Sequence, residues 1–197
     1  MKKMYLFCAM MLLTACGTTR PSTFYVLDGG VSPERSVTIK DARGILIGIE
    51  PVFVPDYLNK PQIVVRQPDG VTLTASEYNR WAEQVSDVFP RVLGDAVSAR
   101  MGFPVAKQIN LNRDLFPYRL YVEIIRFDAA FGEQAVLDAW WTVMTGKGDV
   151  LRRTRTTVTE RAGNDYAAIV AAERTLIDRL GAEIADYASK HLKKSVK

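Results

Sequence analysis

The sequence contains few residues of the kinds that catalyse reactions or bind metals. Its 197 residues include one histidine, His191, and two cysteines, Cys8 and Cys16. A lone histidine among C-terminal lysines disfavours imidazole general-base catalysis, Ser-His-Asp triads and histidine-ligated metals. Gly44 and Gly48 stand in an expected strand, not at the helix opening that a phosphate-binding loop requires. The composition therefore argues against an enzyme, and we expect no catalytic residues, no metal site and no cofactor.

The sequence also has no hydrophobic run of the length that crosses a membrane. The apolar run Met4–Leu13 has ten residues and would span about 15 Å as a helix, roughly half of the hydrocarbon core. Two lysines precede this run, and the small residues Thr14 and Ala15 follow it, which is the pattern of a secretory signal. We therefore expect residues 1–15 to be a signal peptide that is removed.

Cys16 lies directly after the expected cleavage point. Leu13-Thr14-Ala15-Cys16 resembles the lipobox of bacterial lipoproteins. The resemblance implies cleavage between Ala15 and Cys16, and a covalent diacylglycerol and N-acyl chain on Cys16, which together anchor a protein stably. The alternative is an ordinary secretory signal with an incidental cysteine. Gly17 stands where lipoproteins retained in the inner membrane commonly carry aspartate, which favours the outer membrane in a bacterium with two membranes.

Cleavage would leave 182 residues, enough for one domain with its own core. We expect residues 16–22 to be a lipidated tether and residues 23–197 a single α+β domain. Cys8 leaves with the signal, so the mature domain would have no disulfide and no cysteine metal site. The formal charge falls from +4 to +2, and this small, scattered excess indicates no nucleic-acid partner.

Strand and helix patterns alternate along the chain. Strands are expected at residues 24–27, 44–54, 62–66, 71–75, 104–109, 118–131, 135–145 and 149–160, and amphipathic helices at 79–101 and after the capping residue Asn164. Pro90 should kink or divide the first helix, and Gly146-Lys147-Gly148 predicts a tight hairpin. The pattern predicts an α+β fold: a mostly antiparallel β-sheet with two long amphipathic helices packed on one face.

The apolar residues of the strand at 118–131 change parity partway along it. Leu120 and Ile124 share one face, whereas Phe127 and Ala129 continue on the opposite parity. A bulge near Ile124-Ile125 would keep both sets on one core. The alternative is that the second half is covered on both sides, for example by a neighbouring subunit.

Exposed apolar residues are the remaining candidates for function. Trp140 and Trp141 must point to opposite faces of one strand. Trp141 shares parity with a set of core residues, whereas Trp140 lies on a face that mixes polar and apolar residues. Trp140 is therefore either an interface anchor or part of a second packing layer. The arginines of "LRRTRTT" (Arg152, Arg153 and Arg155) could bind lipid headgroups or an acidic protein. The favoured interpretation is that these charges lie on an edge strand and prevent its pairing with another strand.

A turn bounded by two prolines, "PDYLNKP", is a further candidate. Such a rigid turn can present an aromatic residue and a leucine to a partner at low entropic cost, or it can cover the edge of the core. The candidate interface residues are Pro55, Asp56, Tyr57, Leu58, Pro61, Trp81 and Trp140.

Several stretches of the chain resemble one family. "FYVLD" after the cysteine, "IGIEPVFVPDYLNKPQIVVR" at 47–66, "RWAE" at 80–83 and "RVLGDAVSARMG" at 91–102 are similar to the PqiC-type lipoproteins, the auxiliary components of ABC-type transport systems. The resemblance covers nearly the whole mature chain, and the Pro-Asp-Tyr-Leu and Pro-Gln-Ile-Val block is its most specific part.

The resemblance implies a non-catalytic, periplasm-facing outer-membrane lipoprotein. It would dock a periplasm-spanning MCE-domain protein, whose inner-membrane component completes a system that moves lipids or other hydrophobic molecules and maintains membrane integrity. It also implies a homo-oligomer, including a ring-shaped collar. Two alternatives stay open: a monomeric lipid-carrier or envelope-assembly lipoprotein, and an envelope enzyme built on a convergent carboxylate pair in a deep pocket.

Overall fold

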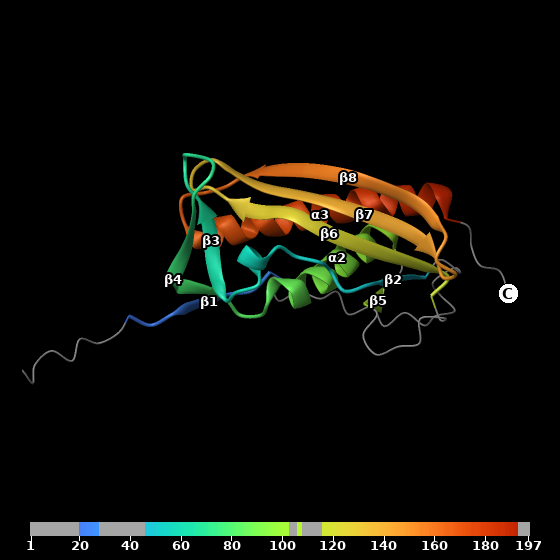
Figure 1. Cartoon of the computed structure of the whole chain (residues 1–197), viewed down its shortest axis with the longest axis horizontal. Helices are drawn as coiled ribbons and strands as arrows, with labels where there is room; N and C mark the ends of the chain where they lie inside the picture. The colour runs from blue at the N-terminus through green and yellow to red at the C-terminus, as the bar shows by residue number, and fades with distance from the viewer. Residues whose placement is uncertain (1–19, 28–45, 103–105, 108–115, 193–197) are drawn as a thin grey trace, which may run out of the picture.

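The described part of the protein is a twisted sheet with two long helices packed on one face (Figure 1). The computed structural model describes residues 20–27, 46–102, 106–107 and 116–192. The strands are β1 (Thr23–Tyr25), β2 (Ile47–Ile49), β3 (Gln62–Arg66), β4 (Leu73–Trp81), β5 (Ala106–Lys107), β6 (Tyr118–Ala129), β7 (Gln134–Thr145) and β8 (Val150–Arg161). A 3-10 turn, η3 (Asp56–Leu58), and the helices α2 (Val85–Met101) and α3 (Tyr166–His191) are the other described elements.

The strands form a mixed sheet centred on β6. One edge of β6 pairs antiparallel with β7, which in turn pairs antiparallel with β8. The other edge of β6 is shared by β2 and β3, both parallel to it, and β4 and β1 continue the sheet beyond β3. The α+β class is confirmed, and the sheet is mixed and not purely antiparallel. Its long ladders, β6–β7 and β7–β8, are antiparallel, whereas the short β1–β4 and β2–β5 pairs are parallel.

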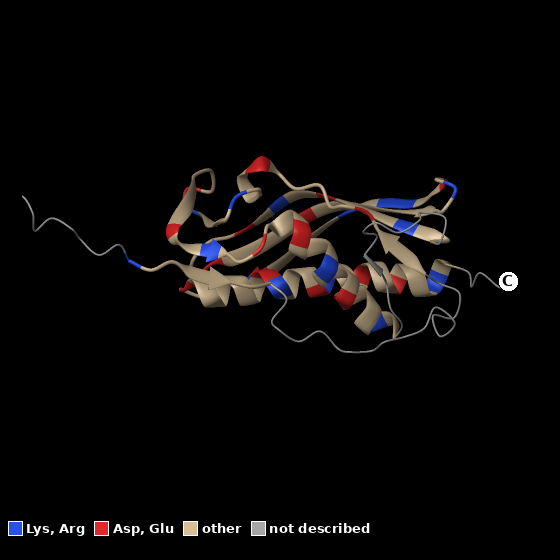
Figure 2. Cartoon of the chain, turned by 90° about the horizontal axis from the view of Figure 1, so that it is seen from below, with Lys and Arg blue, Asp and Glu red and all other residues tan. Residues whose placement is uncertain are grey.

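The helices pack on the sheet face that carries the alternate apolar residues of β6 and β7. Leu137, Trp141 and Val143 of β7 are buried on this face. Phe89 of α2 meets Phe127 of β6 edge-to-face, with ring centroids 5.6 Å apart. Seen from below, acidic and basic residues are interspersed over the helices (Figure 2), so the solvent side of this layer carries no block of one charge sign among the residues drawn in colour.

The parity change in β6 is a β-bulge, as the sequence predicts. The register with β7 shifts between Ile124 and Arg126, and Ile125 is the extra residue, 40% exposed. Ile124 before the bulge and Phe127 after it are buried in the same core. The hairpin between β7 and β8 is also confirmed, and Gly148 within it has a φ of 100°.

The first helix starts later than its hydrophobic pattern predicts. Residues 79–81 are the last residues of β4, and α2 begins only at Val85. The apolar Trp81 fits the helical spacing by coincidence, because its backbone N–H donates to the carbonyl of Pro61 beside the β3–β4 ladder, at 2.7 Å. With this later start, Pro90 lies in the second turn of a single helix and removes only the bond to the carbonyl of Ser86.

Two further expectations are corrected or lie partly outside the described residues. The residue that caps α3 is Asp165, whose side chain accepts a hydrogen bond from the backbone N–H of Ala168 at 2.8 Å, and not Asn164. The expected strand at 104–109 is described only at Ala106–Lys107, where β5 pairs with β2.

Candidate functional site

The lipidation site and the cleavage site lie outside the described residues. Cys16 and Ala15 therefore remain predictions, as do residues 16–19 of the expected tether. The described chain begins at Arg20, which is exposed, as are Pro21 and Ser22.

The proline-bounded turn fills a gap along one edge of β6. The chain after β2 follows this edge as far as Phe53, whose backbone carbonyl accepts from the N–H of Ile124 at 2.9 Å. β3 joins the same edge only at Val65, which pairs with Ala129. Between these two points the Tyr57 hydroxyl accepts a hydrogen bond from the backbone N–H of Phe127 at 3.0 Å. A side chain of η3 thus replaces the missing strand partner.

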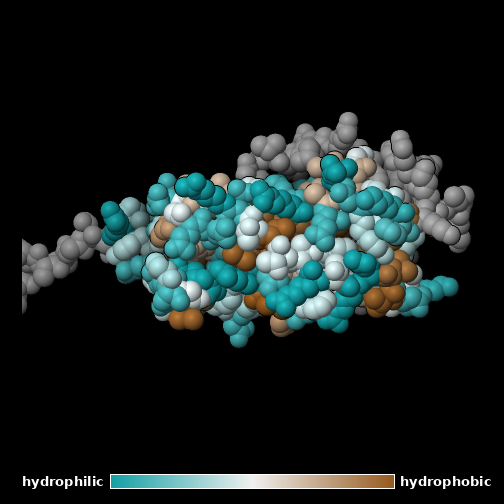
Figure 3. All heavy atoms as spheres, turned by 90° about the horizontal axis from the view of Figure 1, so that it is seen from above, coloured by the Kyte–Doolittle hydropathy of each residue, from teal (hydrophilic) through white to brown (hydrophobic). Residues whose placement is uncertain are grey.

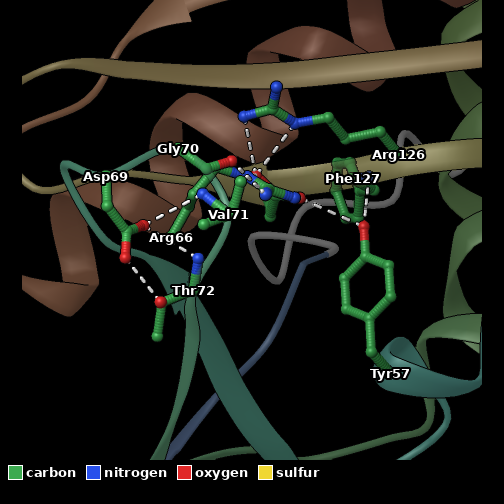
Figure 4. A network of polar contacts seen from close by, with 9 residues as sticks. Tyr57, Arg66, Asp69, Gly70, Val71, Thr72, Arg126 and Phe127 are labelled. Atoms are coloured by element: carbon green, nitrogen blue, oxygen red, sulfur yellow. Dashed lines mark hydrogen bonds and ion pairs between the residues drawn. The ribbon is translucent and has the colours of Figure 1, made fainter.

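The same hydroxyl belongs to a polar cluster around Asp128, shown in Figure 4. Tyr57 donates to one carboxylate oxygen of Asp128 at 3.1 Å. Arg66 of β3 approaches with two nitrogens, at 2.8 and 2.6 Å, and Nε of Arg126 donates at 3.0 Å. We call Tyr57, Arg66, Arg126 and Asp128 the Asp128 cluster. It joins η3, β3 and β6 through charged hydrogen bonds, which are stronger than neutral ones.

The charges of this cluster shift the acidities of its members. Burial by itself raises the pKa of Asp128, but the hydrogen bonds and positive charges of Arg66 and Arg126 outweigh burial and hold that pKa below its ordinary value. Burial also raises the pKa of Tyr57 to about 12, and the neighbouring Asp128 carboxylate adds to the shift. At neutral pH Asp128 is therefore ionised and Tyr57 is a neutral hydrogen-bond donor.

A second buried carboxyl, Glu173, comes from the helix layer. It is 2% exposed, and its Oε2 has no hydrogen-bond partner among the described residues. Burial, with a further contribution from the charge of Asp128, raises the pKa of Glu173 well above its ordinary value. Asp128 is fully buried too, so neither carboxyl is open to a substrate. The pair does not form the accessible acid and base that the enzyme alternative requires.

The structure divides the predicted interface residues into buried and exposed ones. Leu58 and Trp81 are each 6% exposed and belong to the core. The turn therefore covers the edge of the core, the second of the two interpretations. The other predicted residues of the turn are half-buried, as are Pro55 and Tyr57, or exposed, as are Asp56 and Pro61.

Trp140 lies on the sheet face opposite the helices. It is half-buried, and the guanidinium of Arg153 sits 5.1 Å from the centre of its ring. Trp141, in contrast, is buried and donates to the hydroxyl of Thr156 at 3.0 Å. The expected division between a core tryptophan and an outward one is correct. The structure places Trp140 beside β8 and Tyr57 beside β3, and no described contact joins the two.

Sequence reasoning missed most of the Asp128 cluster. Asp128 stands in the apolar stretch "FDAAF", and this position was the available signal, because an aspartate between buried residues requires a partner. Its partner Arg66 lies 62 positions earlier, and no local pattern indicates which arginine reaches it.

Within the described residues no group of three or more His, Cys, Asp or Glu side chains could hold a metal ion. None of the described helices is long and apolar enough to span a membrane.

These features define a class: an α+β domain with a tightly bonded polar cluster and with buried carboxyls that no substrate can reach. Residues 25–185 match the model of the family described as the ABC-type transport auxiliary lipoprotein component. The chain belongs to this family, and the resemblance seen in its motifs is thereby confirmed.

Solved structures show the same fold. One, described only as an uncharacterized protein, is 21% identical with a TM-score of 0.69, and the match covers 85% of this chain and 98% of that one. A protein from Xanthomonas campestris is 17% identical with a TM-score of 0.64, over 84% of this chain and 94% of its own. No curated protein matches the chain.

Proposed function

We propose that this chain is a non-catalytic, outer-membrane lipoprotein of the PqiC type, which docks a periplasm-spanning MCE-domain protein for the transport of lipids or other hydrophobic molecules. The observation that carries the proposal is the family match over residues 25–185, which follows soon after a lipobox at Leu13–Cys16. The inner-membrane component of the same system would be the more distant partner.

The chemistry of the described residues supports a docking role over a catalytic one. The buried carboxyls of Asp128 and Glu173 are closed to solvent. Outward-facing groups suited to a protein partner are present instead: Trp140 on the outer sheet face and Asp56 and Pro61 on the turn. A rigid turn and a half-buried aromatic residue lose little entropy on binding.

The test is a mass measurement of the mature protein in a nonionic detergent, alone and with the periplasmic part of an MCE protein encoded beside it. Light scattering with absorbance and refractive-index detection gives the mass of the protein part. We expect a discrete oligomer that binds the MCE protein. A monomer indifferent to it contradicts the proposal and favours a lipid carrier, which co-purified lipid would then identify.

A pair of variants locates the docking surface. Trp140→Ala removes the aromatic group of the outer face and is expected to weaken the complex about tenfold or more, as the loss of a hot-spot residue does. Phe24→Ala is the control, because Phe24 is 62% exposed but lies on β1, in the opposite edge strand of the sheet. Equal binding by both variants would exclude Trp140 from the interface.

A further inference from the structure

The outer edge of β8 is an open sheet edge in the described part of the protein. β8 pairs with β7 alone, over twelve residues. The backbone N–H and C=O groups of one residue in an antiparallel strand point to the same side, and successive residues alternate sides. An unpaired edge of this length is a template for another strand unless it is blocked.

The two ends of this edge are blocked by side chains of α3. The hydroxyl of Tyr187 donates to the carbonyl of Leu151 at 3.3 Å, and Nη1 of Arg179 donates to the carbonyl of Thr159 at 2.6 Å. Because the carbonyl of Thr159 points outward, so do the backbone groups of the residues with the same parity before it. These residues, which form the open window of β8, are Arg153, Arg155 and Thr157.

The window is charged and its surroundings are hydrophilic. Figure 3 views the molecule from the side along which β8 runs in Figure 1, and this surface is mostly hydrophilic with separate small apolar areas. Arg153 lies over Trp140, and Arg155 is already paired with Asp138. Among the residues that the structure describes, neither Arg153 nor Arg161 forms an ion pair with a carboxylate, so no salt bridge there holds either guanidinium.

The charge pattern selects the kind of strand that fits. Two copies of β8 paired antiparallel about residue 155 would bring four arginine side chains together, Arg153 and Arg155 of each copy, and only Arg155 is paired, with Asp138. The positive charges of the two copies would therefore repel one another across the pair. A strand with carboxylates at alternate positions would instead place them about 5 Å from the arginine side chains of the outer face. The edge therefore disfavours a second copy of this chain and favours an acidic segment.

We propose that the open window of β8 binds an extended, acidic segment of a partner protein by strand addition. The window supplies backbone hydrogen bonds at Arg153, Arg155 and Thr157. The positive charge comes from Arg153 and from Arg161, which shares its parity and hence its sheet face. The contacts of Tyr187 and Arg179 with β8 limit the pairing to the central part of the strand. This inference goes beyond the proposed function, because it holds for whichever protein provides the segment.

The experiment uses three synthetic nine-residue peptides and the isotopically labelled mature protein in a nonionic detergent. The first peptide alternates Glu with Thr, the second alternates Lys with Thr, and the third is the Glu peptide with all its backbone nitrogens methylated. The third peptide keeps every side-chain charge but has no backbone N–H donor and carries methyl groups along both edges, so it cannot pair as a strand. Amide hydrogen exchange of residues 153, 155 and 157 is measured with each peptide.

We expect only the unmethylated Glu peptide to slow exchange at these three amides, by about fivefold or more, because strand pairing protects the amides that it bonds. The amides of Thr154 and Thr156, which face β7, should stay unchanged. Raising the salt concentration from about 50 mM to about 500 mM, which screens the charges, should reduce this protection.

Two variants and two outcomes decide the proposal. Arg153→Glu should abolish the protection, and Lys60→Glu, a change at an exposed position on the proline-bounded turn, should not. If the methylated peptide binds as well as its parent, the contact is electrostatic only, and the proposal is wrong. Absence of protection with all three peptides overturns it equally.

Discussion

At the scale of the residue, Asp128 joins the other three members of the Asp128 cluster through its hydrogen bonds. Its carboxylate is fully buried and accepts hydrogen bonds from Arg66, Arg126 and Tyr57. Asp128→Asn removes the negative charge and leaves two arginines without their partner. We expect the free energy of unfolding at pH 7 to fall by about 3–5 kcal/mol, as for other broken buried ion pairs, measured by urea denaturation.

The pH dependence gives an independent check on Asp128. Its pKa is lower in the folded state than in the unfolded one, so its contribution is fully present above about pH 4 and is lost as the pH falls through the folded pKa. The difference between wild type and variant should therefore shrink in acid. Asp178→Asn is the control, because Asp178 pairs with Arg174 at the surface, and we expect a change below about 0.5 kcal/mol there.

Tyr57 is tested by the removal of one oxygen. Tyr57→Phe keeps the ring but deletes the acceptor of the Phe127 N–H and one donor to Asp128. An unsatisfied buried donor costs about 1–3 kcal/mol, and we expect a loss of this size in urea denaturation. Unchanged stability would show that water satisfies the N–H and that the gap in the sheet is hydrated.

The contribution of Glu173 to stability changes with pH in the opposite direction to that of Asp128. The folded pKa of Glu173 lies well above the unfolded value, so its contribution is fully present below about pH 4 and is lost as the pH rises towards the folded pKa. Glu173→Gln removes the ionisable group. The free energy of unfolding of this variant should therefore rise relative to that of the wild type by about 1.4 kcal/mol for each pH unit in that interval. Glu133→Gln, at an exposed position, should follow the wild-type pH profile. Parallel profiles for wild type and Glu173→Gln would contradict the assigned environment.

At the scale of the element, the contact between α2 and α3 depends on a glycine. A Cβ atom on Gly181 would lie 2.6 Å from the Cβ of Ala96, closer than real Cβ atoms approach. Gly181→Ala should therefore destabilise the protein by about 1–3 kcal/mol, although alanine is the better helix former. Adding Ala96→Gly makes room and should restore part of the loss in thermal unfolding. Additive losses in the double variant would contradict this packing.

The elements also show what the sequence could and could not predict. The bulge in β6 and the outward position of Trp140 follow from parity within one strand, so local patterns predicted both. The start of α2 could not be predicted from the local pattern, because Trp81 fits the helical spacing. In the structure its N–H instead donates to the carbonyl of Pro61 beside the β3–β4 ladder. The parallel pairs of β2 and β3 with β6 connect distant segments, and single-strand patterns carry no information about such pairing. The ion pair between Arg66 and Asp128 could not be predicted for the same reason, because the two residues are far apart in the sequence.

At the scale of the whole molecule, the lipid anchor expected at Cys16 would decide where the domain works. The domain residues match a lipoprotein family, and the expected attachment point, Cys16, is the last residue of the lipobox-like stretch Leu13–Cys16. Cys16→Ser removes the thiol that receives diacylglycerol, and without the acyl chains the protein loses the source of stable membrane affinity. We expect the variant to move from the membrane fraction to the soluble periplasmic fraction, as measured by immunoblotting after osmotic shock and ultracentrifugation.

The substitution at Cys8 is the matched control for the anchor. Cys8 lies within the expected signal peptide, so Cys8→Ser should leave both processing and membrane association intact. If Cys16→Ser stayed in the membrane fraction, the lipobox assignment would be wrong, because some other part of the chain would hold the protein there. If it left the membrane and still bound the MCE protein in solution, anchoring and docking would be separate properties, with docking carried by the folded domain and its exposed surfaces.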